Sequence, residues 1–266
     1  MRRTAILTAI IFMTIYSPGL QGQTRYERNF HQDMPIIQAG LSLCSLGLHL
    51  RSQIEPLDTL ILDKVSSESV FMVDRPATLQ WSPTAARISD IFLLSEILLP
   101  LGLLSDTIYR EDFSDLSTLY FESLLLTIAG TLVTKSLVKR PRPYIFNQNA
   151  PVEKRISLES RQSFFSGHTS IAFASAMFLS MVLETYHTNS EFAPWVKIGS
   201  FSSAALVGYL RIKAGEHYLT DVLTGAIFGS MVSYLVLKSH EQTGYNLDQI
   251  DSLESKFCRL KVTITF

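Results

Sequence analysis

Residues 196–237 read VKIGSFSSAALVGYLRIKAGEHYLTDVLTGAIFGSMVSYLVL. Two apolar runs in this stretch, Val196–Leu210 and Leu219–Leu237, are each long enough for a helix and are separated by a short polar piece. Continuous apolar runs of this length predict helices that are buried or that span a membrane. We therefore expect two neighbouring helices whose polar connection, from Arg211 to Asp221, lies at one end of the fold.

Four further apolar runs of helix length occur earlier in the chain: Ile36–Leu50, Ile88–Ile108, Leu116–Val138 and Thr169–Leu183. The sequence thus predicts an all-α fold, a helical bundle with about five or six helices. Crossing a bilayer takes about 20 mainly apolar residues, and several runs are shorter or contain an acidic residue. We expect a transmembrane bundle; a soluble protein with equally apolar buried helices is the alternative, because the mean hydropathy is only +0.20.

Length and composition limit the classes of function. The chain has 266 residues, of which 47% are hydrophobic, so it can form one large core or a membrane bundle without a second domain. Its formal net charge is -1 and its pI is about 6.6, so no basic field attracts nucleic acid, and we expect no nucleic-acid partner. The two cysteines, Cys44 and Cys258, lack CxxC spacing and indicate neither a metal site nor a disulfide framework.

The two ends of the chain differ from its apolar centre. Arg2 and Arg3 precede the apolar run Ala5–Tyr16, which is the order found in a secretory signal, and an uncleaved membrane anchor is the alternative. The polar stretch Arg51–Ala86 is broken by prolines and is expected to connect helices outside the membrane. We divide the chain into a signal peptide or N-terminal anchor (1–22), an N-terminal helical and irregular region (23–85), a helical core (86–240) and a polar C-terminal tail (241–266).

A basic cluster closes the run Leu116–Val138. It reads Lys135, six residues, then Arg142 and Pro143. Cations at a helix C-terminus are often only partners of the helix dipole or flanking charges of a membrane helix, so the cluster alone is weak evidence. Pro141 and Pro143 nevertheless force the chain out of the helix on either side of Arg142. This would hold the Arg142 guanidinium in a fixed position, where its paired N–H groups could bind an anion.

Ser166, Gly167 and His168 stand where the next helix begins. Serine and glycine at a helix start are commonly no more than a cap. The same position offers backbone N–H groups and the positive end of the helix dipole to an anion, and a glycine lets the anion come close to the backbone. His168 would then lie beside that anion.

The third motif lies between the last two helices and reads Arg211, five residues, His217, three residues, Asp221. If its last part is helical, His217 and Asp221 share a helix face, so the carboxylate can hold one imidazole nitrogen while the other stays free to attack. A histidine four residues before an aspartate is, in isolation, more often an incidental polar pair. The other two motifs make the catalytic interpretation the stronger one.

The three motifs, in order, are Lys135-x6-Arg142-Pro143, Ser166-Gly167-His168 and Arg211-x5-His217-x3-Asp221. This series resembles the signature of the type 2 phosphatidic acid phosphatase superfamily, in its membrane lipid phosphatase branch, which is related to class A acid phosphatases and vanadium haloperoxidases. The resemblance covers about Leu116–Leu237. The chain departs from it at Phe165, where the family usually has proline, and at Leu210, where it has serine. These departures concern affinity and substrate preference more than the type of reaction.

The resemblance implies a metal-independent phosphatase that works through a phosphohistidine intermediate and needs no cofactor. His217 would be the nucleophile, oriented by Asp221, and His168 would protonate the leaving oxygen and later activate water. The residues implied to bind phosphate are Lys135, Arg142, Ser166, Gly167 and Arg211. The sequence shows no paired-carboxylate cluster of the kind that a two-metal phosphatase uses, so no metal ligand is assigned.

Membrane helices beside the site indicate a phosphomonoester or pyrophosphate of a membrane lipid as the substrate, with the membrane as the second partner. Three alternatives stay open: a soluble periplasmic acid phosphatase acting on small phosphoesters, a vanadate-dependent haloperoxidase, and a non-catalytic lipid-binding membrane scaffold. Asp221, four residues after the nucleophilic histidine, fits the phosphatases better than the haloperoxidases.

All three motifs should lie at the same end of the bundle, because the first ends one helix, the second begins the next, and the third follows after two further crossings. We expect the bacterial inner membrane, with this end facing the periplasm. This orientation follows if the N-terminal segment is cleaved and Ile36–Leu50 lies in the membrane interface. It also follows if residues 1–22 do not span the membrane, the N-terminus stays inside and Ile36–Leu50 spans the membrane. The remaining histidines lack partners at useful spacing and are expected at the surface or the interface: His31, His49, His187 and His240.

Overall fold

The computed structural model describes residues 26–62, 66–187 and 190–241 of the chain. Within these residues every regular element is a helix, and the β-type pairing is limited to one isolated bridge between Tyr26 and Glu241. The prediction of an all-α fold is therefore confirmed. The predicted signal peptide or anchor (1–22), and all but the first residue of the predicted tail (241–266), lie outside the described residues.

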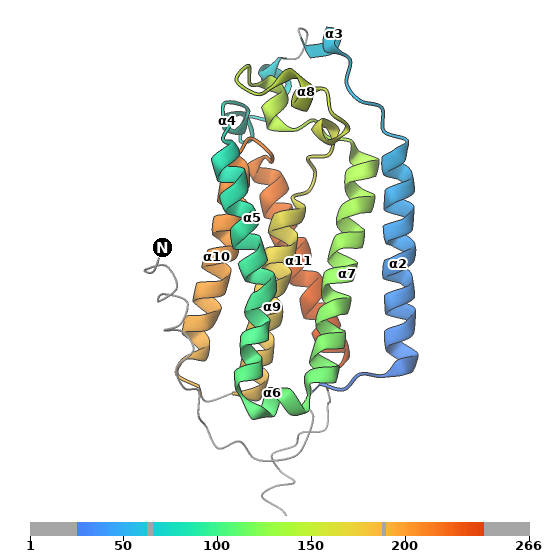
Figure 1. Cartoon of the computed structure of the whole chain (residues 1–266), viewed down its shortest axis with the longest axis vertical. Helices are drawn as coiled ribbons and strands as arrows, with labels where there is room; N and C mark the ends of the chain where they lie inside the picture. Colours follow the sequence, from blue (N-terminus) through green and yellow to red (C-terminus); the bar gives the residue numbers. More distant parts are fainter. Residues whose placement is uncertain (1–25, 63–65, 188–189, 242–266) are drawn as a thin grey trace, which may run out of the picture.

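Six long helices run side by side along the longest axis of the molecule (Figure 1). They are α2 (Phe30–Ser52), α5 (Pro83–Leu98), α7 (Phe113–Val138), α9 (Gly167–Tyr186), α10 (Ala193–Lys213) and α11 (Leu219–Ser239). Each contains one of the predicted apolar runs, except that the run Ile88–Ile108 continues from α5 through the 3₁₀-helix η3 (Leu99–Ser105). The predicted bundle of about five or six helices is thus confirmed.

Local sequence signals set the helix ends. Asn29, Ser82 and Ser166 cap α2, α5 and α9, each with a side-chain oxygen that accepts a backbone N–H. Pro83 takes the first position of α5, where its missing N–H leaves no bond unmade. Helix α7 ends where Lys139 adopts a left-handed conformation (φ 50°) just before the prolines.

Short helices cover the two ends of the bundle. They are α3 (Thr59–Leu62), η2 (Ser67–Ser69), α4 (Arg75–Thr78), α6 (Thr107–Glu111), η4 (Pro143–Phe146), α8 (Val152–Arg155) and η5 (Leu158–Arg161). Figure 1 shows α3, α4 and α8 at one end and α6 at the other. The stretch Arg51–Ala86, expected to connect helices outside the membrane, contributes α3, η2 and α4.

Helix α9 is the centre of the bundle and contacts α5, α7, α10 and α11. Its small side chains allow this packing, because Ala172, Ala174 and Ala176 are completely buried. On α11, a Cβ atom at Gly229 would lie 1.9 Å from the carbonyl oxygen of Ser170, so the two helix backbones touch there. Close packing through small residues is common where helices associate in lipid.

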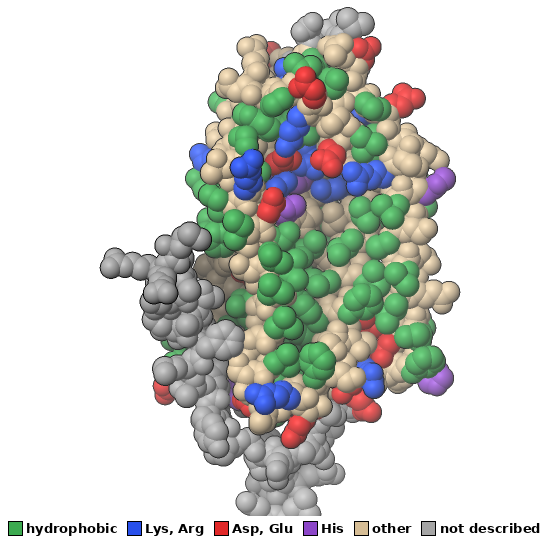
Figure 2. All heavy atoms as spheres, viewed as in Figure 1, with side chains coloured by type: hydrophobic (Ala, Val, Ile, Leu, Met, Phe, Trp, Pro, Cys, Tyr) green, Lys and Arg blue, Asp and Glu red, His purple; other side chains and the backbone are tan. Residues whose placement is uncertain are grey.

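Between its two ends the bundle carries an apolar surface. Figure 2 shows hydrophobic side chains over the middle of the molecule, with charged side chains gathered toward the ends. Ile91, Trp195 and Ile227, on three different helices, are 64%, 71% and 68% exposed. Four helical segments are long and apolar enough to cross a membrane: Pro83–Ser105, Phe113–Phe146, Gly167–Tyr186 and Leu219–Ser239. The protein is a membrane protein, as the sequence predicted.

Candidate active site

Four helix ends meet at the end of the bundle that is uppermost in Figure 1. They are the C-terminal ends of α7 and α10 and the N-terminal ends of α9 and α11. The three sequence motifs therefore come to the same end of the molecule. Figure 2 shows Lys, Arg, Asp, Glu and His side chains gathered in a band at this end.

The first motif holds Arg142 rigidly and places Lys135 near the start of α9. The Arg142 backbone N–H donates to Ser160 O at 2.7 Å, and Arg142 Nε donates to Glu159 O at 2.9 Å. Arg142 is 8% exposed, so its guanidinium is fixed inside the protein. Lys135 Nζ, in the last turn of α7, lies 3.9 Å from where a Cβ atom at Gly167 would stand.

Ser166 caps α9 and joins it to α11. Its Oγ accepts the Thr169 N–H at 3.4 Å and the Thr169 hydroxyl at 2.9 Å, and its own N–H donates to Asp221 O at 3.1 Å. The structure thus shows the completely buried Ser166 in its capping role. The first N–H groups of a helix have no partner within the helix, so the amides of Gly167 and His168 can serve an anion.

His217 lies in the turn between α10 and α11. Its four-residue spacing from Asp221 would instead suggest that both residues lie on one helix face. Helix α10 ends at Lys213, and Gly215 then adopts φ 72°. A Cβ atom at Gly215 would lie 2.2 Å from Gln80 O, so this turn requires glycine. His217 directly precedes Tyr218, the N-cap of α11.

The Asp221 carboxylate folds back from the first turn of α11 toward His217. Its Oδ2 lies 3.6 Å from His217 Nδ1 and accepts the Tyr218 N–H at 3.0 Å and Ser163 Oγ at 2.5 Å. Its Oδ1 accepts Arg140 Nη1 at 2.5 Å. The completely buried carboxylate is therefore fixed by three donors. The structure brings His217 and Asp221 together through the capping of α11, and not because both lie on one helix face.

His217 is completely buried, and neither ring nitrogen has a hydrogen-bond partner among the described residues. Burial is the main reason that the pKa of His217 lies well below its usual value, and the cations Lys135, Arg142 and Arg211 lower it further. The imidazole is therefore neutral at physiological pH. A neutral imidazole carries the lone pair that nucleophilic attack requires.

Arg211, in the last turn of α10, is the third cation of the site. Its Nη1 donates to Ser89 Oγ at 3.3 Å and lies 3.5 Å from Asp90 Oδ1, while its Nη2 lies 3.5 Å from Glu216 Oε2. Its Nε has no hydrogen-bond partner among the described residues, although the side chain is only 8% exposed. Arg211 thus has a buried donor to offer an anion.

Glu216 is a site residue that the sequence analysis missed. It forms an ion pair with Arg142, and its Oε1 accepts Lys154 Nζ at 2.5 Å. Burial alone would raise the pKa of Glu216, but Arg142, Arg211 and Lys154 outweigh burial and lower the pKa to about 2. A carboxylate among these cations opposes the binding of an anion, so a sequence search for clustered cations gives no reason to include Glu216.

His168, at the start of α9, pairs with Asp90 of α5. His168 Nε2 lies 2.9 Å from Asp90 Oδ1. The two side chains are 32% and 58% exposed, so the pair lies on the open side of the site, whereas His217 lies inside it. No pattern in the sequence points to Asp90, because only the packing of α5 against α9 joins the two residues.

A further missed group supports the α11 side of the site. Arg140 Nη2 donates to Asp74 Oδ2 at 2.8 Å, and the Thr220 N–H donates to Asp74 Oδ1 at 3.0 Å. Asp74 is 1% exposed and belongs to the polar connection 51–86. Because Arg140 also binds Asp221, this connection helps to fix the carboxylate that faces His217.

The expectation for the remaining histidines is wrong for two of them. His31 and His49 are exposed, as predicted. The His187 side chain is 8% exposed, with Nε2 3.3 Å from Asp106 Oδ2, and His240 is 4% exposed and pairs with a buried carboxylate. Their partners come from other helices and turns of the fold, which the spacing along the chain cannot show.

The site can bind and stabilise a tetrahedral anion. Three cations, Lys135, Arg142 and Arg211, and the N-terminus of α9 surround a neutral histidine. Phosphate binding uses the same elements, because arginine forks and helix N-termini both match phosphate oxygens. Among the described residues, no group of three metal-type ligands lies at this end of the bundle.

Residues 117–245 match the profile of the PAP2 superfamily. A probable diacylglycerol pyrophosphate phosphatase 1 from Schizosaccharomyces pombe is 26% identical over 152 residues, which are 46% of this chain and 54% of that protein. The lipid A 1-phosphatase of Porphyromonas gingivalis is 35% identical over 89 residues, which are 32% of this chain and 19% of that protein. A solved transmembrane PAP2 type phosphatidylglycerolphosphate phosphatase from Bacillus subtilis is 25% identical, covers 74% of this chain and 93% of its own, and has a TM-score of 0.47.

The chain spans about half the length of the first of these curated relatives and less of the second. The matched residues include all three motifs, from Lys135 to Asp221, which the fold gathers at one end of the bundle. Residues 117–245 are a PAP2 superfamily region, which agrees with the resemblance of the three motifs to the type 2 phosphatidic acid phosphatases.

Proposed function

We propose that the protein is a phosphatase that removes phosphate from a phosphomonoester or pyrophosphate of a membrane lipid, through a phosphohistidine at His217. The observation that carries the proposal is the gathering of Lys135, Arg142 and Arg211 around the buried, neutral His217 at one end of a membrane bundle. The PAP2 superfamily region supports this reaction, and so do the names of the two curated relatives, both lipid phosphatases.

The substrate phosphate binds between the three cations and the N-terminus of α9. Arg142 and Arg211 match phosphate oxygens with their planar forks, and Lys135 adds a point charge. The amides of Gly167 and His168 donate to the same oxygens. Phosphoryl transfer depends on positioning and on stabilising charge spread over these oxygens, which is what this set of groups provides.

His217 attacks phosphorus with Nε2, because Asp221 faces its Nδ1. The new P–N bond forms as the bond from phosphorus to the leaving oxygen breaks, and the bonding pair goes to that oxygen. His168 gives this oxygen a proton, so the lipid leaves as an alcohol or, from a pyrophosphate, as a monophosphate.

Hydrolysis then restores the enzyme. His168, now neutral, takes a proton from a water molecule as the water oxygen attacks phosphorus. The P–N bond breaks, its electron pair returns to His217, and inorganic phosphate leaves. The three cations supply the charge that a metal ion supplies in other phosphatases, so we expect activity to persist in the presence of a chelator.

Asp221 and Asp90 act on the two histidines and not on the substrate. Asp221 fixes the ring of His217 and stabilises the positive charge that develops on it during attack. Asp90 bonds Nε2 of His168 and so orients its ring, with Nδ1 as the nitrogen that exchanges a proton with the substrate. Both aspartates are therefore positioning residues.

A lipid substrate suits the open side of the site. His168 and Asp90 are the exposed members of the site, and on α5 the neighbouring apolar residues Ile91 and Leu94 are 64% and 57% exposed. An acyl chain can lie along this apolar face while its phosphate reaches the cations. A water-soluble phosphoester gains nothing from this surface.

We place the protein in the bacterial inner membrane with the site facing the periplasm. Helix α2 packs lengthwise against α7, and Ser136 Oγ of α7 donates to Gly47 O of α2 at 3.1 Å, which supports a bundle helix over a helix lying in the interface. The chain enters α2 at the end opposite the site (Figure 1). A cytoplasmic start of α2 therefore gives a periplasmic site, and this topology requires that residues 1–22 do not cross the membrane.

Phosphate release tests the proposed function. The detergent-purified full-length protein is assayed in chelator with a panel of lipid phosphates and pyrophosphates and with one water-soluble phosphoester. We expect release from a lipid that persists in chelator, is lost in His217→Gln and is unchanged in His49→Gln, the control at an exposed histidine. Release from the soluble ester alone would point to a small-molecule acid phosphatase. Equal release by folded His217→Gln and wild-type protein would overturn the proposal.

A further inference from the structure

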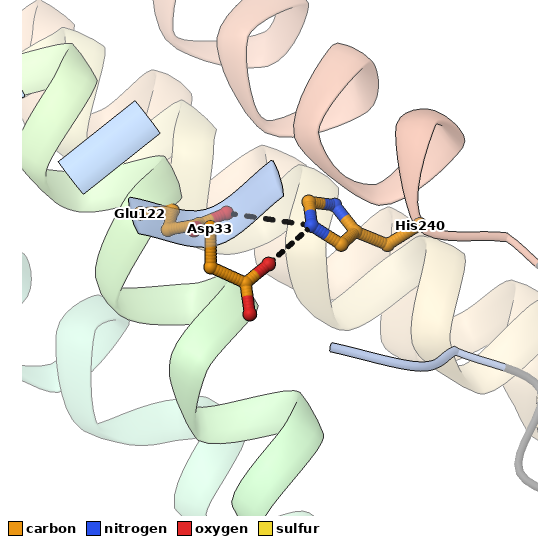
Figure 3. Close-up of side chains that lie close together, drawn as sticks. All are labelled: Asp33, Glu122 and His240. Carbon is orange, nitrogen blue, oxygen red and sulfur yellow. Dashed lines mark hydrogen bonds and ion pairs between the residues drawn. The ribbon is translucent and has the colours of Figure 1, made fainter. Parts of the chain in front are cut away.

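A second cluster of buried polar side chains lies at the other end of the bundle from the active site. Figure 3 shows Asp33 of α2, Glu122 of α7 and His240, which follows the last residue of α11. His240 Nε2 lies 2.8 Å from Asp33 Oδ1 and 3.9 Å from Glu122 Oε2. One nitrogen and two carboxylate oxygens of these residues all lie within 4.8 Å of one another. The phosphatase proposal uses none of these residues.

The charge of this cluster is not balanced by the surrounding protein. Asp33 and Glu122 are 4% and 0% exposed, and among the described residues neither forms an ion pair with a lysine or an arginine. Neither oxygen of Glu122 has a hydrogen-bond partner in the described part of the chain. Buried carboxylates are stable only when they are paired, protonated or bound to a metal. The two buried oxygens of Glu122 therefore lie beside His240 without a hydrogen bond from the described residues.

The histidine of this cluster is oriented as a ligand. His240 Nδ1 lies 2.8 Å from Val236 O, which can only accept, so Nδ1 carries the proton. The other nitrogen, Nε2, therefore turns its lone pair toward Asp33 and Glu122 in the neutral ring. Metal-binding histidines commonly have this arrangement, in which a backbone carbonyl accepts the N–H that does not face the metal.

We propose that Asp33, Glu122 and His240 bind a divalent transition-metal cation, with Zn²⁺ as the best match. One imidazole nitrogen and two carboxylate oxygens are ligands that Zn²⁺ accepts, whereas Ca²⁺ and Mg²⁺ prefer oxygen alone. Tetrahedral bonds of about 2.1 Å place ligand atoms about 3.4 Å apart, and the separations of 2.8 Å and 3.9 Å from His240 Nε2 lie on either side of this value. A cavity of about 550 Å³, lined by His240 together with Ser239 and Gln32, lies beside the site.

The ion at this site is structural and separate from the proposed phosphatase reaction. Glu122 and Lys135 lie on the same helix α7 and are separated by about 20 Å at the helical rise per residue. The ion would tie the start of α2 and the end of α11 to α7, which are three segments far apart in the sequence. Its removal is expected to lower stability and to leave the chemistry at His217 intact.

Zinc binding by the full-length protein in detergent tests the site. The protein is purified through a tag without histidine, stripped with chelator, and titrated with Zn²⁺ against a competing chromophoric chelator. We expect one tightly bound Zn²⁺ per chain and a rise in the unfolding temperature on binding. In Glu122→Gln and in Asp33→Asn we expect affinity to fall by at least about tenfold, the loss that even outer-shell changes cause.

The matched control is His187→Gln, which removes a buried histidine that pairs with a single carboxylate, Asp106. We expect this variant to bind Zn²⁺ as the wild type does. Co²⁺ in place of Zn²⁺ gives a visible spectrum that reports a nitrogen ligand in the wild-type protein, even if a variant fails to fold. No bound Zn²⁺ in the folded wild type, or equal binding by folded Glu122→Gln, would overturn the proposal and leave a protonated His240 as the partner of the carboxylates.

Discussion

Glu216 places a negative charge among cations that a phosphate also needs. Its carboxylate is bound by Arg142 and Lys154 and lies 3.5 Å from Arg211. These contacts keep the cations in place before the substrate arrives, because removing one partner of a buried ion pair leaves the other uncompensated. The residue therefore stabilises the site and at the same time competes with the substrate.

The pKa of Glu216 predicts how stability depends on pH. Its pKa is lowered from 4.5 unfolded to about 2 in the folded protein. The stability that it contributes, about 3 kcal/mol, is therefore complete above the unfolded pKa and is lost as pH falls through that value toward the folded one. We expect Glu216→Gln to unfold at a lower temperature near neutral pH and to lose less stability on acidification than the wild type.

Thermal unfolding in detergent at several pH values checks this prediction. The control is Glu184→Gln, which removes an exposed carboxylate that pairs with Lys197. We expect the control to behave as the wild type, because exposed ion pairs contribute little. Identical pH profiles for Glu216→Gln and the wild type would show that Glu216 does not stabilise the folded site.

Asp221 offers a second test at the level of single residues. Asp221→Asn keeps the size of the side chain but removes the charge that stabilises a positive His217, so we expect kcat to fall on the order of 10⁴-fold with little change in KM. The control Asp74→Asn also loses a carboxylate bound to Arg140, yet Asp74 does not face His217. An equal loss of kcat in both variants would assign the effect to Arg140 and not to the contact with His217.

The sequence predicts those site residues whose spacing along the chain carries the information. Arg142, His168 and His217 stand in motifs, and their chemistry can be inferred before the fold is known. Asp90 and Asp74 cannot be found this way, because they reach the site only through the packing of α5 and the polar connection against other helices. Each pairs with a residue far away in the sequence, and no local sequence pattern marks such a pair.

At the level of helices, the contact between α9 and α11 limits which side chains are tolerated. Gly229→Ala would place a Cβ atom 1.9 Å from Ser170 O, and a backbone atom cannot move away cheaply. We expect a loss of about 1 to 3 kcal/mol in the free energy of unfolding. Gly199→Ala in α10 meets no atom within 4 Å and should instead stabilise by about 0.5 to 1 kcal/mol.

Unfolding curves of the two glycine variants in the same detergent compare them directly. Opposite signs of the two changes would support the packing of α9 against α11. A Gly229→Ala protein as stable as the wild type would mean that the helices are farther apart than the structure shows.

The helices themselves are readily predicted, because each long apolar run lies within one helix, except Ile88–Ile108, which continues from α5 through η3. The turn that carries His217 is the exception. A spacing of four residues fits two residues on one helix face, but Gly215 and the cap of α11 make His217 part of a turn. The Asp221 side chain folds back to the N-cap of α11, and this brings it as close to His217 as a shared helix face would. The four-residue spacing alone therefore does not distinguish a turn from a helix.

At the scale of the whole molecule, the bundle has two chemically different ends. One end carries the proposed active site, and the other carries Asp33, Glu122 and His240. The apolar surface between them fixes the protein in the membrane, so the two ends face opposite sides of it. Determining which side one end faces therefore determines the side of the other.

Cysteine labelling tests the proposed orientation. In a background of Cys44→Ala and Cys258→Ala, Gln148→Cys places an exposed thiol near the site, and Ser105→Cys places one at the other end. We expect a membrane-impermeant maleimide to label Gln148→Cys in spheroplasts and to label Ser105→Cys only after the membrane is opened. The reverse pattern would place the site in the cytoplasm.

The central claim is that His217 carries the phosphoryl group during turnover. Its most direct test is to mix the purified full-length protein with a lipid phosphate labelled on the phosphate, quench it in denaturant at alkaline pH, and map the label by mass spectrometry. We predict one phosphoryl group on the peptide that contains His217, stable to base, lost in acid and absent from folded His217→Gln. Continued turnover with no trapped label, or a label on any other residue, would contradict the account.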